Sequence, residues 1–202
     1  MEYMIRPLGN LEDPLLERVA LLHQSVMRLL LNDLGFPMIL RYYQIARSDP
    51  LVIGFCAISS TNEILGWVVG SPDPYHLNAR LQKPLSWFLK QIIRLAVTRP
   101  AVFAQVLLSV FYPPEKNLAA HTIELTYIGV APNVQNKGIG QALLNAFTEA
   151  SRSSRYGYIE LTTEMDNLHA LAFYEKSGFT VKRTFREGRF ERYRMERKLL
   201  PS

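Results

Sequence analysis

Residues 130–140 read Val-Ala-Pro-Asn-Val-Gln-Asn-Lys-Gly-Ile-Gly, and this stretch predicts a turn from a strand into a helix. A β-rich run, 122–131, leads into it, and an amphipathic run at helical spacing, 138–152, continues from it. The first N–H groups of a helix have no partner inside the helix and lie at the positive end of its dipole. Because glycine has no Cβ, Gly138 and Gly140 let a ligand approach this backbone closely. The stretch therefore predicts a site for a pyrophosphate.

Two common nucleotide-binding motifs do not fit this turn. The dinucleotide motif needs a small residue three places after Gly140, where this chain has Leu143. The P-loop needs Gly-Lys followed by Ser or Thr, whereas the order here is Lys137, Gly138, Ile139. Taken alone, two glycines at a helix start favour ordinary turn chemistry, so the assignment depends on a second block.

That second block lies a short way downstream. Residues 160–163 end a predicted strand, and a helix predicted over 167–177 is stopped by Gly178. The residues of this block, in order, are Asn167, Ala170, Phe173, Tyr174, Gly178 and Phe179. Together with Gln135-x-x-Gly138-x-Gly140, the block resembles the GNAT acetyltransferases, whose loop pattern is Arg or Gln, two residues, Gly, one residue, then Gly or Ala. The resemblance covers roughly residues 122–180.

The resemblance implies that the chain binds acetyl-CoA as a cosubstrate and transfers its acetyl group directly to a primary amine, without an acetyl-enzyme. It implies a pyrophosphate site made of Gln135, Asn136, Lys137, Gly138, Ile139 and Gly140. It assigns the pantetheine arm to Asn167 and to the backbone of Ile128 and Val130, where their strand separates from the next. It assigns Tyr174 as the general acid, and a phenol with a pKa near 10 is protonated at neutral pH.

Some of these roles have a structural alternative. Glu124 is the candidate general base, and a structural hydrogen bond of its carboxylate is an equal alternative; His121 and Tyr127 are weaker candidates for the base. Core packing on an amphipathic helix is the alternative for Phe173 and Tyr174. Strict alternation places Glu124, Thr126, Ile128 and Val130 on one face of the strand and Leu125, Tyr127 and Gly129 on the other.

The expected fold is a single α/β GNAT domain over residues 1–202, with a mixed, mostly antiparallel sheet flanked by helices. Strands are expected over 3–8, 51–58, 64–70, 122–131, 158–163, 179–186 and 190–199. Helices are expected over 12–34, 37–47, 85–97, 101–111, 138–152 and 167–177. Asn10 is expected to cap the first helix and Gly35 to end it.

A helical insertion is expected between the third and fourth strands, over residues 72–121. No acidic residue stands between Asp73 and Glu115, a segment that contains several cations and many apolar residues. The insertion is interpreted first as core packing with a role in the acceptor pocket. A peripheral membrane contact is the second interpretation, since an apolar face edged by Lys and Arg is typical of interfacial helices.

The composition is that of a folded protein, with 48% hydrophobic residues and a net charge of +5. The lone cysteine, Cys56, excludes an internal disulfide framework and is expected to be buried and inert. The chain is expected to be cytoplasmic and either a monomer or a homodimer, with no metal and no nucleic-acid partner. The expected acceptor is a small-molecule amine such as an amino sugar or its nucleotide-linked form. The alternatives are a protein or peptide N-acetyltransferase and a non-catalytic CoA-binding module.

Overall fold

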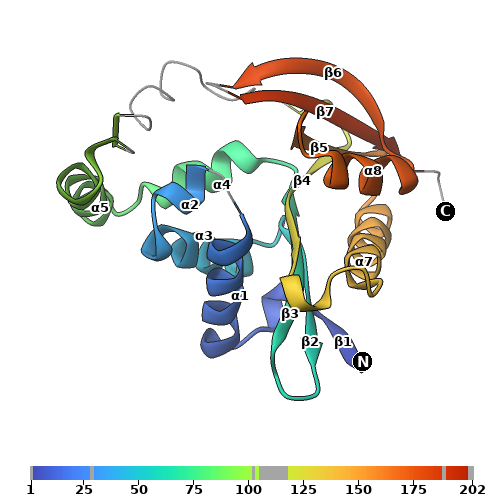
Figure 1. Cartoon of the computed structure of the whole chain (residues 1–202), viewed down its shortest axis with the longest axis horizontal. Helices are drawn as coiled ribbons and strands as arrows, with labels where there is room; N and C mark the ends of the chain where they lie inside the picture. Colours follow the sequence, from blue (N-terminus) through green and yellow to red (C-terminus); the bar gives the residue numbers. More distant parts are fainter. Residues whose placement is uncertain (1, 28–29, 102, 105–117, 188–189, 200–202) are drawn as a thin grey trace.

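The structure, a computed structural model, describes residues 2–27, 30–101, 103–104, 118–187 and 190–199 (Figure 1). The described strands form one sheet in the order β1-β2-β3-β4-β5-β7-β6, and each neighbouring pair is antiparallel except β4 with β5. The strands are β1 (Tyr3–Pro7), β2 (Ile53–Ser59), β3 (Ile64–Ser71), β4 (Thr122–Val130), β5 (Tyr158–Glu164), β6 (Thr180–Glu187) and β7 (Phe190–Lys198). The expected mixed, mostly antiparallel sheet is confirmed.

Helices cover both faces of this sheet, with α1 to α4 on one face and α7 and α8 on the other (Figure 1). The helices are α1 (Asp13–Val26), α2 (Leu30–Asp33), α3 (Phe36–Ser48), α4 (Pro74–Leu81), α5 (Leu85–Thr98), α7 (Ile139–Ser153) and α8 (Leu168–Lys176), with 3-10 turns η1 (Leu8–Asn10) and η2 (Pro132–Val134). Alternate side chains of β3 serve the two cores: Trp67 and Val69 pack under α1 and α3, and Val68 packs with Phe147 of α7.

The single helix expected over 12–34 is wrong. Helix α1 ends at Val26, and Met27 takes an extended backbone with φ of −93° and ψ of 143°. Met27 packs against the core under α1, and this contact prevails over the helical spacing that continues through it. Gly35, expected to end the long helix, instead precedes α3 with φ of +89°. Glu12, and not Asn10, precedes α1 and makes no side-chain cap.

Helices α4 and α5 follow β3 in the chain, and α5 lies farthest from the sheet in Figure 1. Helix α5 confirms the expected helix over 85–97. Helix α4 was not expected; it begins after Asp73, whose Oδ1 accepts a hydrogen bond from the His76 backbone N–H at 2.8 Å. The helix expected over 101–111 lies almost entirely outside the described residues. In the described ranges, every helix lacks the length and apolarity that a membrane span requires.

Strand β4 contains a bulge at Thr126. Gly70 of β3 pairs with Leu125, and the β3 residue before Gly70 pairs with Tyr127, so Thr126 is an extra residue opposite β3. The strict alternation expected for this strand is therefore wrong. Leu125 and Ile128 both contact the core under α7, although alternation would place them on opposite faces. A bulge interrupts the ladder and bends its strand, which sets up the geometry of the candidate site.

Candidate functional site

The parallel strands β4 and β5 separate just beyond the bulge (Figure 1), and the interval between their unpaired ends is called the opening. The last paired residues of these two strands are Leu125 and Leu161. Strand β4 continues to Val130 while still paired with β3, and β5 continues to Glu164 while paired with β7. The separation of the strand before the loop, expected from the resemblance, is therefore present between the carboxyl ends of β4 and β5.

The backbone of β4 presents two residues to this opening. The Ala131 N–H donates to the Leu65 carbonyl oxygen at 2.8 Å, so Ala131 faces β3. Because successive residues of a strand direct their backbone groups to opposite edges, Val130 and Ile128 face the edge from which β5 has separated. The Gln135 side-chain Nε2 lies 3.4 Å from the Val130 carbonyl oxygen, on that same edge. These are the two residues whose backbone was predicted to contact the pantetheine arm.

The predicted pyrophosphate loop lies at the end of β4. Gln135, Asn136, Lys137 and Gly138 are all exposed, whereas the Ile139 side chain is buried, so only the backbone of Ile139 is available to a ligand. Asn136 and Gly138 have positive φ values of 59° and 80°. Gly138 precedes α7 without a side-chain cap, which leaves the first N–H groups of that helix available to an anion.

The two glycines of the loop have different surroundings. A Cβ on Gly138 would meet no atom within 4 Å, so the space beside this residue is open. A Cβ on Gly140 would lie 3.6 Å from a Val130 methyl and 3.8 Å from the Phe173 ring. Gly140 therefore lies in the contact that joins the start of α7 to β4 and α8, and Gly138 is the residue that a phosphate can approach.

Helix α8 places the other two predicted residues. Asn167 caps it, with its Oδ1 accepting from the Ala170 backbone N–H at 3.1 Å. Tyr174 is buried, with its ring 5.4 Å from that of Phe173 and 5.7 Å from that of Phe179. Burial raises the pKa of the Tyr174 phenol well above its ordinary value, so the hydroxyl keeps its proton at neutral pH. The Tyr174 side chain therefore packs in the core and also keeps a protonated hydroxyl.

Glu124 belongs to a charged network that crosses the sheet. Arg194 of β7 places Nη2 2.8 Å from the Glu124 carboxylate and Nε 2.8 Å from the carboxylate of Glu160. Lys182 of β6 bridges Glu160 at 2.7 Å and Glu196 at 2.8 Å. Although burial acts to raise it, hydrogen bonds from Lys182 and Arg194 hold the pKa of the Glu160 carboxyl below its ordinary value. The Glu124 side chain keeps 20% of its surface exposed.

Sequence reasoning missed Arg194 as a partner of Glu124. The two residues are far apart in the chain and meet only because β7 pairs with β5, which in turn pairs with β4. In the strand over 190–199, Arg194 shares its face with Arg192, Glu196 and Lys198, so no local signal singled it out.

Other residues considered from the sequence have structural roles. Tyr42 and Tyr43 are fully buried beneath the sheet. Cys56 is buried as expected, and burial raises the pKa of its thiol to about 12. His121 has φ of 59°, and its carbonyl oxygen accepts from the Gly157 N–H at 2.7 Å.

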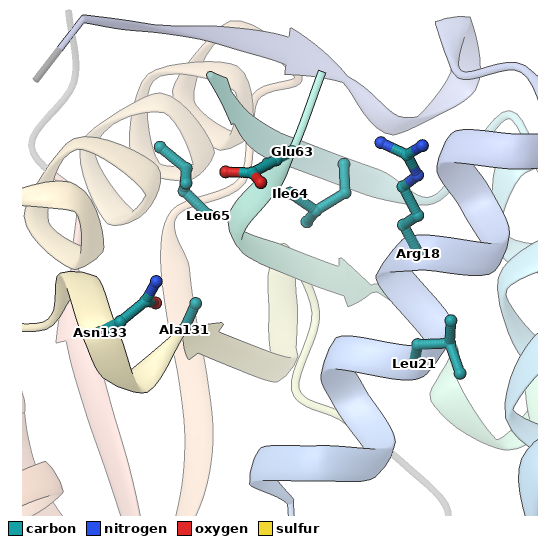
Figure 2. Close-up of a pocket in the computed structure, with 7 residues that line it drawn as sticks. All are labelled: Arg18, Leu21, Glu63, Ile64, Leu65, Ala131 and Asn133. Atoms are coloured by element: carbon teal, nitrogen blue, oxygen red, sulfur yellow. The ribbon is translucent and has the colours of Figure 1, made fainter. Parts of the chain in front are cut away.

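A separate surface hollow of about 390 Å³ lies at the opposite edge of β4, on the side of β3 (Figure 2). Its lining residues come from α1, the start of β3 and the exit of β4: Arg18, Leu21, Glu63, Ile64, Leu65, Ala131 and Asn133. None of the predicted site residues lines this hollow. The opening between β4 and β5 and this hollow are thus different features.

The model of the Acetyltransferase (GNAT) family matches residues 22–179, most of the chain. The chain belongs to the GNAT acetyltransferase family. The family uses acetyl-CoA, and the open loop at Gly138 fits a pyrophosphate. The fold, the enzyme class and the cosubstrate expected from the sequence are confirmed.

The chain is similar to three acetyltransferases, to one in part of its sequence and to two in fold. A mycothiol acetyltransferase of Beutenbergia cavernae is 39% identical over 61 residues, which are 30% of this chain and 20% of that protein. The ribosomal-protein-S18-alanine N-acetyltransferase of Escherichia coli has a TM-score of 0.61 at 13% identity, covering 100% of this chain and 96% of its own. A paiA N-acetyltransferase of Thermoplasma acidophilum, solved with coenzyme A, has a TM-score of 0.61 at 15% identity, covering 98% and 99%. The chain spans a third or less of the length of the curated relatives it matches.

Proposed function

We propose that this GNAT enzyme acetylates the primary amine of a small molecule, by direct attack of the amine on acetyl-CoA in a ternary complex. The observation that carries the proposal is the alignment of three features along one opening. The backbone of Ile128 and Val130 faces it, the uncapped start of α7 lies at its end, and Phe173 of α8 lies beside Gly140 at that same end, from which Asn167 and Tyr174 are proposed to reach the cosubstrate. The domain is proposed to span residues 1–202, with 72–121 as its insertion.

In this mechanism the amine nitrogen attacks the thioester carbonyl carbon, the new C–N bond forms, and the C–S bond breaks. The amine loses a proton to Glu124, and the departing sulfur takes a proton from Tyr174, which gives an amide and free coenzyme A. The Tyr174 phenol is protonated at neutral pH and so has a proton to give, and its raised pKa makes it a weaker acid than an exposed tyrosine. Asn136 and Lys137, with Gln135 and the backbone from Gly138 to Gly140, are proposed to hold the pyrophosphate.

Glu124 is proposed as the base, with Arg194 fixing its position. The 2.8 Å ion pair holds the carboxylate at the point where β4 and β5 separate, and the exposed part of the side chain is available to an amine. Arg194 has a second carboxylate partner, Glu160, so its guanidinium is itself held in place.

The acceptor class is tested by thiol release from acetyl-CoA with a panel of amines. The panel contains amino sugars, nucleotide-linked amino sugars, polyamines, amino acids, aminoglycosides and short peptides. We expect release with one small-molecule class, together with a product whose mass has increased by one acetyl group. Acetylation confined to peptides would refute the small-molecule proposal. Silence with every amine, despite intact acetyl-CoA binding, would contradict transfer to these acceptors and favour a binding module.

The general acid is tested by Tyr174→Phe. We expect kcat to fall by about 100-fold or more while the affinity for acetyl-CoA changes little, since general acid catalysis contributes about 10²–10⁴-fold. Tyr156→Phe is the matched control, because Tyr156 also packs against the core under α7 and lies outside the proposed site. Equal kcat values for Tyr174→Phe and the wild type would remove Tyr174 from the mechanism.

A further inference from the structure

Helix α5 carries an apolar stripe that faces away from the rest of the described structure. Leu85, Leu89, Ile93 and Val97 are spaced four residues apart, so they lie along one side of the helix. Their exposed fractions are 63%, 48%, 63% and 77%. At a rise of 1.5 Å per residue, the stripe is about 18 Å long. A continuous exposed apolar surface of this kind marks an interaction site more often than a chance arrangement.

The stripe is not the side by which α5 packs on the protein. Trp87 and Phe88, which project from the other side of the helix, contact the core under α1 and α3, and Leu95 is buried. The Arg41 guanidinium also donates to the Lys83 carbonyl oxygen at 3.3 Å, just before the helix begins. Helix α5, which lies at the edge of the molecule (Figure 1), is therefore anchored through one side, and the exposed fractions of its apolar stripe place that stripe on the outer side.

The charge around the stripe is of one sign. Lys90 and Arg94 lie beside it on the helix and are exposed, and neither makes an ion pair among the described residues. Arg80, by contrast, is paired with Asp49 at 2.6 Å. The sequence has no acidic residue between Asp73 and Glu115, and the residues that follow α5, 100–114, carry no charge at all. An outward apolar stripe bordered only by cations has the chemistry of a helix that lies in a membrane interface.

We propose that α5 docks this enzyme on an anionic lipid surface, with its apolar stripe in the interface and Lys90 and Arg94 against the headgroups. Charge complementarity distinguishes this partner from a second copy of the chain. Pairing two copies through their stripes by a two-fold axis would bring both sets of cations together, with no acidic residue of the segment to compensate them. An anionic lipid surface attracts the same cations.

The test is cosedimentation of the full chain with vesicles of phosphatidylglycerol and phosphatidylcholine, compared with vesicles of phosphatidylcholine alone. We expect binding to the anionic vesicles, with an affinity at least tenfold higher than for the neutral ones, that falls as salt is raised. Ile93→Asp with Val97→Asp should lower this affinity more than tenfold, and Lys90→Gln with Arg94→Gln should lower it about fivefold for each cation removed.

Matched controls separate docking from general effects. Leu51→Asp changes another exposed aliphatic residue, and Lys176→Gln with Lys198→Gln removes two exposed cations elsewhere. Both controls should bind vesicles as the wild type does. Ile93→Trp gives a second readout, because its fluorescence should shift to the blue on addition of anionic vesicles but not of neutral ones.

Two results would overturn the proposal. One is absence of binding to anionic vesicles by a wild-type chain that is folded by circular dichroism. The other is a dimer in solution that Ile93→Asp with Val97→Asp converts to a monomer, without any vesicle binding; this would assign the stripe to a second copy. A wild-type melting temperature in the α5 variants excludes loss of folding as the cause of weakened binding.

Discussion

His23 makes the stability of this protein sensitive to acid, and replacing it should remove that sensitivity. The side chain is fully buried under the sheet, where its Nδ1 lies 2.8 Å from the Tyr43 hydroxyl. Its ring also packs edge-on against Tyr127, with the ring centroids 4.8 Å apart. Burial lowers the pKa of the imidazole from 6.5 to about 4, because the cation would lose its hydration there.

The sign and size of the effect follow from this difference in pKa. The unfolded chain takes up a proton at His23 as the pH falls through 6.5, whereas the folded chain does so only near pH 4. The contribution to stability is therefore fully present above pH 6.5 and is lost as the pH falls from 6.5 to 4. Each pKa unit is worth about 1.4 kcal/mol, so the loss between pH 7.5 and 4.5 is about 2.5 kcal/mol.

The assay is urea unfolding of the wild type, His23→Asn and His23→Phe at pH 7.5 and 4.5. Asn can keep a hydrogen bond to Tyr43, and Phe keeps more of the volume of the imidazole ring, so the two variants disturb the packing differently. Neither side chain can take up a proton between pH 7.5 and 4.5. Both variants should be less stable than the wild type at pH 7.5. When the pH is lowered from 7.5 to 4.5, the free energy of unfolding of each variant should fall by about 2.5 kcal/mol less than that of the wild type. If both variants lose as much stability as the wild type over this interval, the assignment of the acid sensitivity to His23 is wrong.

Substitutions at three further positions test the fold and the proposed cosubstrate site. Gly70→Ala should lower the free energy of unfolding by about 2–3 kcal/mol, because its Cβ would lie only 2.5 Å from the Phe147 ring; a melting temperature equal to that of the wild type would contradict this packing. Gly138→Ala should cost only about 1–2 kcal/mol of stability for its positive φ, yet weaken coenzyme A binding at least tenfold in calorimetry, since its Cβ would enter the space left for a phosphate. Asn167→Ala should lower the free energy of unfolding by about 1 kcal/mol, because it removes the hydrogen bond to the Ala170 N–H, whereas Asn167→Asp should keep that stability. The affinity for coenzyme A should fall in both variants. An unchanged affinity in Asn167→Asp would exclude a role for the amide NH₂.

The sequence predicted the part of the fold that is encoded by local signals. The strand, glycine loop and helix over 122–153 have breakers at each junction, and the structure matches their expected bounds closely. Features that depend on tertiary contacts were wrong or missed. The leucine spacing runs through Met27, yet α1 ends at Val26 and the Met27 side chain packs against the core from an extended backbone. Helix α4 is short, and its capping signal, Asp73 before Pro74, lay in a segment interpreted by charge alone.

The candidate site divides in the same way. The loop from Gln135 to Gly140, with Asn167 and Tyr174, could be predicted because the residues of each block are close together in the sequence. The pairing of Glu124 with Arg194 could not, since it depends on the order of β4, β5 and β7 in the sheet. The exposure of the stripe on α5 also could not be predicted from the sequence. The four-residue spacing of its apolar residues is the same for a side that faces outward and for a side that packs on the core.

The bulge at Thr126 has a consequence for how strand β4 can change during evolution. Side chains of a strand repeat with a period of two, so one extra residue shifts the phase of everything that follows it. Deleting Thr126 itself would leave Leu125 opposite Gly70 and Tyr127 opposite Val69 in a regular ladder, which removes the bulge and its bend but keeps Ile128 on its edge. Deleting any other residue of β4 would instead turn the side chains beyond it to the wrong face. Insertions and deletions of one residue should therefore be far less tolerated in β4 than in the loops around it, whatever amine the enzyme acetylates.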